Sequence, residues 1–177
     1  MIFESDFNTP LGKMTCLSSD SGLHLLEFVS RAKSEISKEK KEVAAALQAD
    51  IAKGENDIVR KLKVQMAEYF EGKRQKFSIP LKLIGTEFQL KVWSELMLVP
   101  YGETRSYLEH AESLGDVKAI RAVASANGRN KIAILVPCHR IIGSDGSLTG
   151  YAGGIEKKRF LLNLEREVAG PKDLFSV

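Results

Sequence analysis

The sequence predicts an α+β protein: a small N-terminal domain with an antiparallel sheet and helices, followed by a mainly helical C-terminal domain containing a helix-turn-helix. Three observations carry this prediction. Short strand patterns separated by turn signals open the 177-residue chain, helical patterns with capping signals dominate after Gly85, and two of these helices join through a glycine-containing turn. We place the boundary after residue 80, so that residues 1–80 form a strand-and-helix support domain and residues 81–177 form the C-terminal domain.

Three strands are predicted in the N-terminal domain, over residues 2–7, 13–18 and 22–29. The turn sequences TPLG, at residues 9–12, and SDSG, at residues 19–22, separate them. Because such short connections join neighbouring strands that run in opposite directions, we expect an antiparallel meander.

The remainder of the N-terminal domain is predicted to be helical or irregular. Residues 31–42 are dense in Lys, Glu and Ser, and we expect a solvated loop or a frayed helix there. One helix is predicted over residues 43–52 and another over residues 57–70, where Asn56 is the N-cap and apolar residues at helical spacing indicate a core face. Residues 76–83, around Pro80, are expected to form an edge strand or a connector.

The C-terminal domain opens with two capping boxes. Thr86 with Gln89 begins one helix, and Ser106 with Glu109 begins another that ends near residue 113. A Leu-Gly-Asp turn then leads to a helix over residues 117–126, with Asp116 as its N-cap and an Asn-Gly pair after its end. Two short helices joined by a tight turn are the outline of a helix-turn-helix.

The second helix of this pair carries a stripe of small residues. Ala119, Ala122 and Ala126 share the stripe, with Ser125 near it and Arg121 projecting close by. Two interpretations stay open, because small side chains allow close packing against another helix and also close approach to a nucleic-acid groove.

The last part of the chain contains an apolar run, a glycine-rich loop and a helix. The run at residues 132–136 predicts a buried strand that ends at Pro137, and the final amphipathic helix is expected over residues 155–168, with Glu165 near its end. The loop at residues 143–154 lacks the lysine and hydroxyl residue of a P-loop, so we do not expect a phosphate site there. Tyr151 in this loop is either a pocket wall or a packed aromatic residue.

The composition is that of an ordinary soluble globular protein, with 44% hydrophobic and 28% charged residues and a net charge of +3. Any nucleic-acid surface therefore needs local clustering of charge. Two distant cysteines make no disulfide framework and favour a reducing compartment, and the Cys and His spacing predicts no metal site. We expect no secretory signal and no membrane association, because no apolar run is long enough to cross a bilayer.

Cys138 is the candidate nucleophile, because it lies between Pro137 and His139 with Arg140 following. All charged residues from Val117 through Ser144 are basic, because no Asp or Glu occurs in this segment. Positive charge near a thiol favours the thiolate, so we expect a depressed pKa for Cys138 and a polyanionic partner. The alternative is an inert core cysteine, which is how we interpret Cys16.

Several of these segments resemble one protein family. The segments are GTEFQLKVW from Gly85, VPYGETRSY from Val99, IRAVASANGRN from Ile120, ILVPCHRII from Ile134 and GYAGGIEKKRFLLNLE from Gly150. They are similar to the O6-alkylguanine-DNA alkyltransferases, also called methylated-DNA-protein-cysteine methyltransferases, in their bacterial stand-alone form. The resemblance covers nearly all of the chain after Leu83, whereas the front half is similar only in outline.

The resemblance implies direct-reversal DNA repair. An alkyl group would pass once, irreversibly and without a cofactor, from O6-alkylguanine in double-stranded DNA to Cys138. His139 and Glu165 match the pair that draws the thiol proton through a bound water, and Asn130 matches the hinge between recognition helix and active-site loop. The protein would act as a monomer from the minor groove, in the cytoplasm, or in the nucleus of a eukaryote.

The resemblance also implies substrate and DNA contacts. Tyr107 would aid base extrusion and donate to the departing oxygen together with the backbone amide of Ala152, and the carbonyls of Cys138 and Ile141 would bind the guanine amino group, beside Tyr151. Arg121 would fill the gap left by the rotated nucleotide. The other residues expected to contact DNA are Ala119, Ala122, Ser125, Ala126 and Arg129.

Two positions depart from the family pattern: Lys131 follows Asn130 where proline is usual, and Phe160 stands where tryptophan is common. The lysine either loosens the hinge or adds a phosphate contact. A helix-turn-helix damage-binding or regulatory protein without transfer activity is the main alternative function, and a cysteine hydrolase is another.

Overall fold

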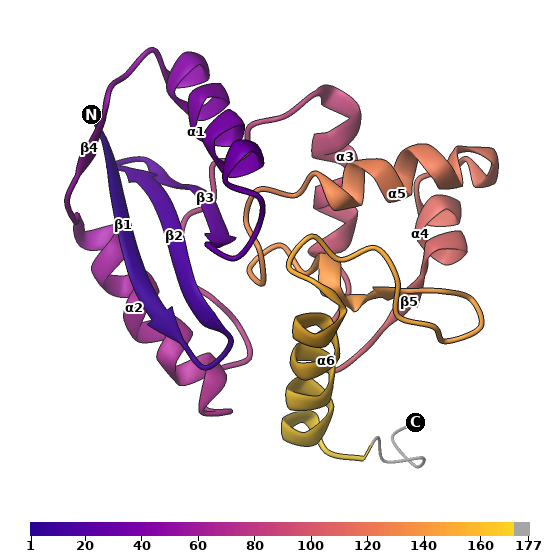
Figure 1. Cartoon of the computed structure of the whole chain (residues 1–177). Coiled ribbons are helices and arrows are strands. Elements are labelled where there is room, and N and C mark those ends of the chain that lie inside the picture. The colour runs from indigo at the N-terminus through magenta and orange to yellow at the C-terminus, as the bar shows by residue number, and fades with distance from the viewer. Residues whose placement is uncertain (172–177) are drawn as a thin grey trace.

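The computed structural model describes residues 1–171, in which an N-terminal sheet with two helices lies beside a mainly helical C-terminal half (Figure 1). The predicted α+β class is confirmed. The strands are β1 (Ile2–Thr9), β2 (Gly12–Ser19), β3 (Gly22–Phe28) and β4 (Ile51–Lys53), in the order β3-β2-β1-β4. The first three form the predicted antiparallel meander, and β4 pairs with β1 in parallel.

Helix α1 (Lys33–Leu47) decides between the two alternatives for residues 31–42 and corrects the helix predicted after them. The charged segment 31–42 is largely helix, and the helix expected over residues 43–52 in fact ends at Leu47, where Gln48 adopts a left-handed conformation with φ 48° before β4 begins. The segment is helical because Ile36 and Val43 turn toward the sheet. Not all of its charges are solvated, since Arg31 lies 2.7 Å from the Glu27 carboxylate and its side chain is only 6% exposed.

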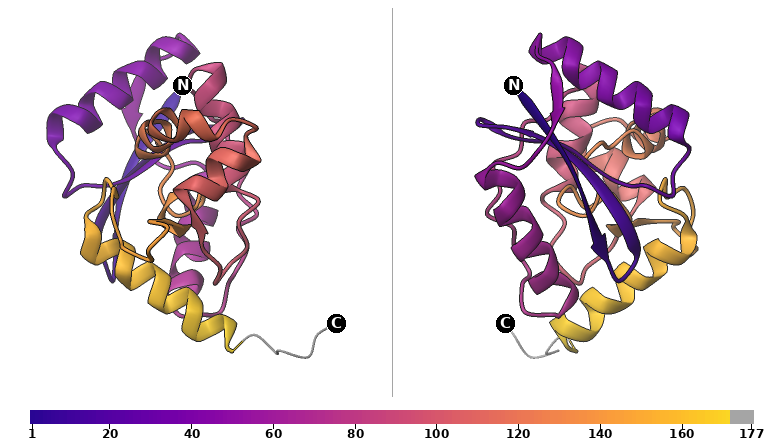
Figure 2. Two further views of the ribbon diagram at one scale, coloured as in Figure 1. Left: turned by 90° about the vertical axis from the view of Figure 1, so that its right-hand side faces the viewer. Right: turned by 60° about the vertical axis from the view of Figure 1, so that its left-hand side comes forward.

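The two faces of the sheet are covered by different elements. Leu17 and Leu25 pack with Val43 of α1 on one face, whereas Met14 and Leu26 belong to a core shared with helix α2 (Asp57–Phe70) and the C-terminal half. The α2 N-cap is confirmed, because the Asn56 side chain accepts a hydrogen bond from the backbone of Val59 at 3.1 Å. In both views of Figure 2, α1 and the last helix lie at opposite ends of the molecule.

The C-terminal half begins with α3 (Glu87–Leu96) and α4 (Tyr107–Ser113), and both predicted capping boxes are present. The helix expected over residues 117–126 starts as a 3-10 turn, η1 (Val117–Ala119), and continues as α5 (Ile120–Gly128). The Asp116 side chain caps η1 by accepting from the Lys118 amide at 2.9 Å. Helices α4 and α5 form the predicted helix-turn-helix at the outer side of this half (Figure 1).

The apolar segment at residues 132–136 is buried but is not the predicted strand. Ile132 makes a single bridge to Leu26 of β3, and Ile134 then turns the chain with φ 71°. The segment leads into the 3-10 turn η2 (Cys138–Arg140) and the short strand β6 (Ile141–Ile142), which pairs with β5 (Arg105–Ser106). Helix α6 (Ile155–Ala169) follows, close to its predicted bounds.

The outer edge of β3 joins the two halves. Leu23 pairs with the connector around Leu81, and Leu26 donates to the Lys131 carbonyl at 2.8 Å while its own carbonyl accepts from Ala133 at 2.8 Å. The sheet is therefore extended by two short pieces of the C-terminal half, which covers an otherwise open strand edge. Within residues 1–171, no helix is long and apolar enough to cross a membrane.

Candidate active site

Cys138 begins the 3-10 turn η2, directly after Pro137, and is buried. Its Sγ accepts a hydrogen bond at 3.3 Å from the side-chain amide of Asn130. The same amide donates to the Val136 carbonyl at 2.9 Å, and the side-chain oxygen of Asn130 accepts from the backbone amide of Ile132 at 2.9 Å. One buried side chain thus holds the turn and the sulfur together.

The Cys138 thiol does not have the depressed pKa that the sequence led us to expect. Burial raises the pKa of Cys138 to about 11, and the Asn130 hydrogen bond opposes this only in part. The neighbouring basic residues do not offset the effect of burial, because Arg140 is paired with Glu165 and Lys131 is paired with Glu42. The resting sulfur is therefore a thiol, and it needs a base to act as a nucleophile.

His139 and Glu165 supply an arrangement suited to that task. His139 Nε2 lies 2.7 Å from Glu165 Oε1, and both side chains are fully buried. Burial lowers the pKa of His139 despite the opposing effect of Glu165, so the imidazole is neutral. With Nε2–H directed at the carboxylate, Nδ1 carries the lone pair, and Nδ1 has no hydrogen-bond partner among the described residues.

Glu165 is also the acceptor for several other buried donors. Tyr69 Oη donates to it at 2.7 Å, Arg140 Nε at 2.8 Å and the Gly102 amide at 3.3 Å. Burial alone would raise the pKa of Glu165, but His139 and Arg140 hold it well below the usual value of 4.5. The carboxylate is charged and fixed in place, which allows it to orient His139.

The cavity at Cys138 is almost closed. Its volume is about 10 Å³, which is room for about one water molecule. Phe28 of β3, Asn130, Tyr151 and Ala152 are among its walls. Tyr151 is therefore a pocket wall, and its buried hydroxyl has no hydrogen-bond partner within residues 1–171. The cavity is far smaller than a typical ligand pocket of about 300 Å³ or more.

Two side chains outside the glycine-rich loop bind its backbone at Thr149. Tyr107 Oη and Lys158 Nζ both donate to the Thr149 carbonyl, at 3.0 Å and 2.8 Å. Lys158 Nζ also donates to the Ile141 carbonyl. Tyr107 and the Ile141 carbonyl, to which the family resemblance assigns substrate contacts, thus contact protein groups in this structure.

The expected DNA-contacting residues fall into two groups. Arg121, Ala122, Ser125 and Arg129 are exposed, and Ala119 is half-buried. Ala126 does not share this surface, because it is buried and its carbonyl accepts a hydrogen bond from Trp93 Nε1 at 2.8 Å. The small-residue stripe therefore divides between helix packing and an exposed face. Lys131 is also withdrawn from solvent, which excludes the phosphate contact considered from the sequence.

Sequence reasoning missed Tyr69 and Lys158. A usable signal existed for Lys158, because residues 158, 161, 162 and 165 follow helical spacing and all lie on the buried face of α6. No local signal marks Tyr69, which reaches Glu165 from a helix 96 residues earlier. Over residues 1–171, no group of three or more His, Cys, Asp or Glu residues is arranged to hold a metal ion.

A helix-turn-helix beside a buried thiol, a neutral imidazole and a carboxylate defines a DNA-binding protein with a candidate acceptor cysteine. Comparison with known proteins agrees. Residues 2–83 match the ribonuclease-like domain of 6-O-methylguanine DNA methyltransferase, and residues 87–167 match the DNA binding domain of the same family. A methylated-DNA–protein-cysteine methyltransferase of Methanosarcina barkeri is 44% identical over 157 residues, covering 89% of this chain and 92% of the relative.

Solved structures give the same result. An O6-methylguanine methyltransferase of Mycobacterium tuberculosis is 40% identical with a TM-score of 0.80, and 98% of each chain is covered. A structure of the M. tuberculosis protein in complex with DNA is 38% identical with a TM-score of 0.81, and 97% of each chain is covered.

The chain therefore belongs to the 6-O-methylguanine DNA methyltransferase family. Membership supports DNA repair by alkyl transfer and a DNA partner, and does not support a regulatory or damage-binding protein without transfer activity.

Proposed function

We propose that this protein repairs O6-alkylguanine in double-stranded DNA by taking the alkyl group onto Cys138. The observation that carries the proposal is the geometry around the sulfur: the Cys138 Sγ lies 3.3 Å from the Asn130 amide, and the next residue, His139, has its Nε2 2.7 Å from the Glu165 carboxylate. A thiol, a base and an orienting carboxylate are the parts that an activated nucleophile needs.

The reaction is a displacement at carbon. The thiol proton passes through a water molecule to His139 Nδ1, and Glu165 stabilises the resulting imidazolium. Sγ then attacks the alkyl carbon, a C–S bond forms, and the C–O bond to guanine breaks. The departing oxygen accepts hydrogen bonds from Tyr107 Oη and the Ala152 amide, while the carbonyls of Cys138 and Ile141 hold the guanine amino group and Tyr151 lines the pocket. Because a thioether has no easily expelled leaving group, each molecule acts once.

The damaged nucleotide must leave the duplex before it can react, because the target atom is inaccessible in stacked DNA. We propose that α5 enters the minor groove and that Arg121 occupies the position of the extruded nucleotide. Ala119, Ala122, Ser125 and Arg129 would contact DNA around it. Loop opening accompanies base entry, since the cavity of about 10 Å³ is far smaller than a base. Tyr107 then exchanges the Thr149 carbonyl for the substrate.

We further propose that the protein works as a monomer without a cofactor in the cytoplasm, or in a nucleus. Residues 1–80 would support residues 81–177, which would bind DNA and accept the alkyl group. The end of the second domain, residues 172–177, lies outside the described residues.

Intact-mass spectrometry tests the proposal. The protein is mixed with duplex DNA containing O6-methylguanine, and we expect a permanent gain of one methyl group, mapped by peptide analysis to Cys138. Cys138→Ser should bind DNA and gain nothing. Cys16 serves as the internal control, because burial in β2 raises its pKa to about 12. An unmodified Cys138 in folded, reduced protein contradicts the proposal, and turnover without modification indicates a hydrolase instead.

A further inference from the structure

Lys131 lies at the seam between the two halves, one residue after the hinge residue Asn130. Only 8% of its surface is exposed. Its ammonium group donates to the Ile84 carbonyl at 2.9 Å and lies 3.1 Å from the Glu42 carboxylate and 5.8 Å from the centre of the Trp93 ring. One side chain thus contacts α1, the connector between the halves, and α3.

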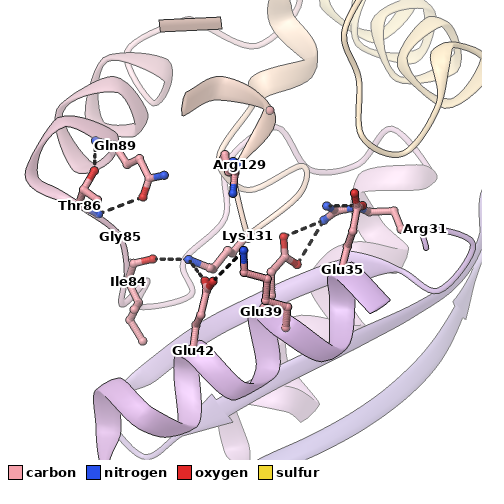
Figure 3. Close-up of a pocket in the computed structure, with 12 residues that line it drawn as sticks. Arg31, Glu35, Glu39, Glu42, Ile84, Gly85, Thr86, Gln89, Arg129 and Lys131 are labelled. Carbon is pink, nitrogen blue, oxygen red and sulfur yellow. Dashed lines mark hydrogen bonds and ion pairs between the residues drawn. The ribbon is translucent and has the colours of Figure 1, made fainter. Parts of the chain in front are cut away.

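Figure 3 shows the contacts of Lys131 with Glu42 and Ile84, in a groove of about 630 Å³ between α1 and the C-terminal half. Glu42 extends from α1 toward Lys131, and the Ile84 carbonyl approaches from the opposite side. The Lys131 side chain is 10% exposed and that of Glu42 is 43% exposed. Water screens the Lys131–Glu42 ion pair in part, so the hydrogen bond from the buried ammonium group to the Ile84 carbonyl is the stronger of the two contacts.

The backbone of Lys131 is fixed as well. Its carbonyl accepts from Leu26 of β3 at 2.8 Å, so the strand edge and α1 hold the same residue from two directions. The preceding residue, Asn130, directs its amide at the Cys138 sulfur. A shift of the hinge backbone at Lys131 therefore moves the group that contacts the sulfur.

We propose that Lys131 is a positioning residue, which couples the N-terminal half to the active-site hinge and keeps the Asn130 amide on the Cys138 sulfur. This inference rests on the alkyl-transfer function proposed above. It assigns to the N-terminal half a role beyond support, because Glu42 and Leu26 supply the contacts that fix the hinge. A side chain at this position without a charge or donor loses the bonds to Glu42 and Ile84 together.

The test measures the rate of transfer from free O6-benzylguanine, which removes the contribution of DNA binding. We expect Lys131→Met to react about 10-fold more slowly, because small displacements of reacting groups are costly. Glu42→Gln should slow the reaction about 2-fold, since the Ile84 bond remains, and the double variant should be no slower than Lys131→Met. Lys131→Arg should stay within about 3-fold of the wild type, because it keeps the charge and the donors.

Lys38→Met is the matched control, because Lys38 also lines the groove on α1 but its side chain is 68% exposed and it lies 4.0 Å from Glu42. Thermal unfolding is recorded for every variant. Equal transfer rates for wild type and Lys131→Met, or an equal loss in Lys38→Met, would overturn the inference even if Lys131→Met melts earlier. If Lys131→Met does not fold, Glu42→Gln alone decides, and a wild-type rate in that variant counts against the coupling.

A spectroscopic measurement separates this inference from the proposed function. The side-chain amide signals of Asn130 are followed by ¹⁵N NMR and assigned with Asn130→Ala. We expect them to move in Lys131→Met and Glu42→Gln but not in Lys38→Met. An inactive wild type would end the transfer proposal only. Unmoved Asn130 signals would end the coupling proposal, whatever the activity.

Discussion

Replacing Glu165 with glutamine tests the buried polar cluster behind the candidate nucleophile. The substitution keeps the size of the side chain but removes its charge and turns one acceptor oxygen into a donor. Glu165 accepts from Tyr69, His139 and Arg140 and from the Gly102 amide, so at least one of these donors would face an NH₂ group. Arg140 would keep its charge without a carboxylate, in a position where its side chain is 10% exposed.

The expected cost follows from this geometry. Removing one partner of a buried ion pair typically costs about 3–5 kcal/mol. For a protein of this size, each kcal/mol lowers the melting temperature by about 2–4 °C, so we expect a decrease of about 6–20 °C. The effect on transfer is separate: without the carboxylate, the imidazolium of His139 is not stabilised, and loss of base assistance should slow the reaction about 100-fold.

Two measurements are made on Glu165→Gln and on Glu167→Gln, a matched control at an exposed position of the same helix. Urea unfolding gives the stability, and the time course of methyl gain at Cys138, by intact mass at 15 °C, gives the rate for folded protein. The control should match the wild type in both. A folded Glu165→Gln protein that reacts within about 2-fold of the wild-type rate would refute the assignment of Glu165 to proton removal.

Two further predictions concern the DNA face and the pH dependence of stability. Arg121 is exposed, and we propose that it acts when a nucleotide is extruded from duplex DNA. Arg121→Ala should therefore slow repair of duplex DNA more than reaction with free O6-benzylguanine, and equal losses on both substrates would contradict this. Burial lowers the pKa of His110 from 6.5 to about 4, so the unfolded chain binds more protons between these values and stability falls as the pH drops through that window. The full shift corresponds to about 3 kcal/mol, which solvent screening reduces to about 2 kcal/mol. Between pH 7 and pH 4.5, the free energy of unfolding in urea should therefore fall by about 2 kcal/mol less for His110→Gln than for the wild type. An equal fall in both proteins would count against the interpretation.

Local signals predicted the elements that depend on local interactions. Both capping boxes and the Asn56 N-cap are present because a side chain three residues from its partner amide fixes each helix start. The strands β1 to β3 were also predictable, because short turns join them and each pairs with its neighbour in sequence. Strand β4 was missed, since its three residues gain their pairing only from β1.

Elements that depend on distant partners were predicted poorly. Residues 31–42 appear fully solvated in sequence because the pairing of Arg31 with Glu27 and Glu39 exists only after folding. The run at residues 132–136 has the composition of a strand, but it pairs with β3 only through a single bridge at Ile132. The positive charge near Cys138 was misjudged likewise, because the partners of Arg140 and Lys131 come from elsewhere in the chain.

The raised pKa of the acceptor suits a protein that is used once. With the pKa of Cys138 at about 11, only about one molecule in 10⁴ carries a thiolate at pH 7. The thiolate is the form that oxidants and stray alkylating agents attack, so a buried thiol in a cavity of about 10 Å³ is protected from both. A turnover enzyme tolerates some loss of reactive sulfur, but here each modified molecule is spent. Under the function proposed here, proton removal through His139 would have to be tied to base entry, and the glycine-rich loop and the hinge at Asn130 would then take part in the chemistry.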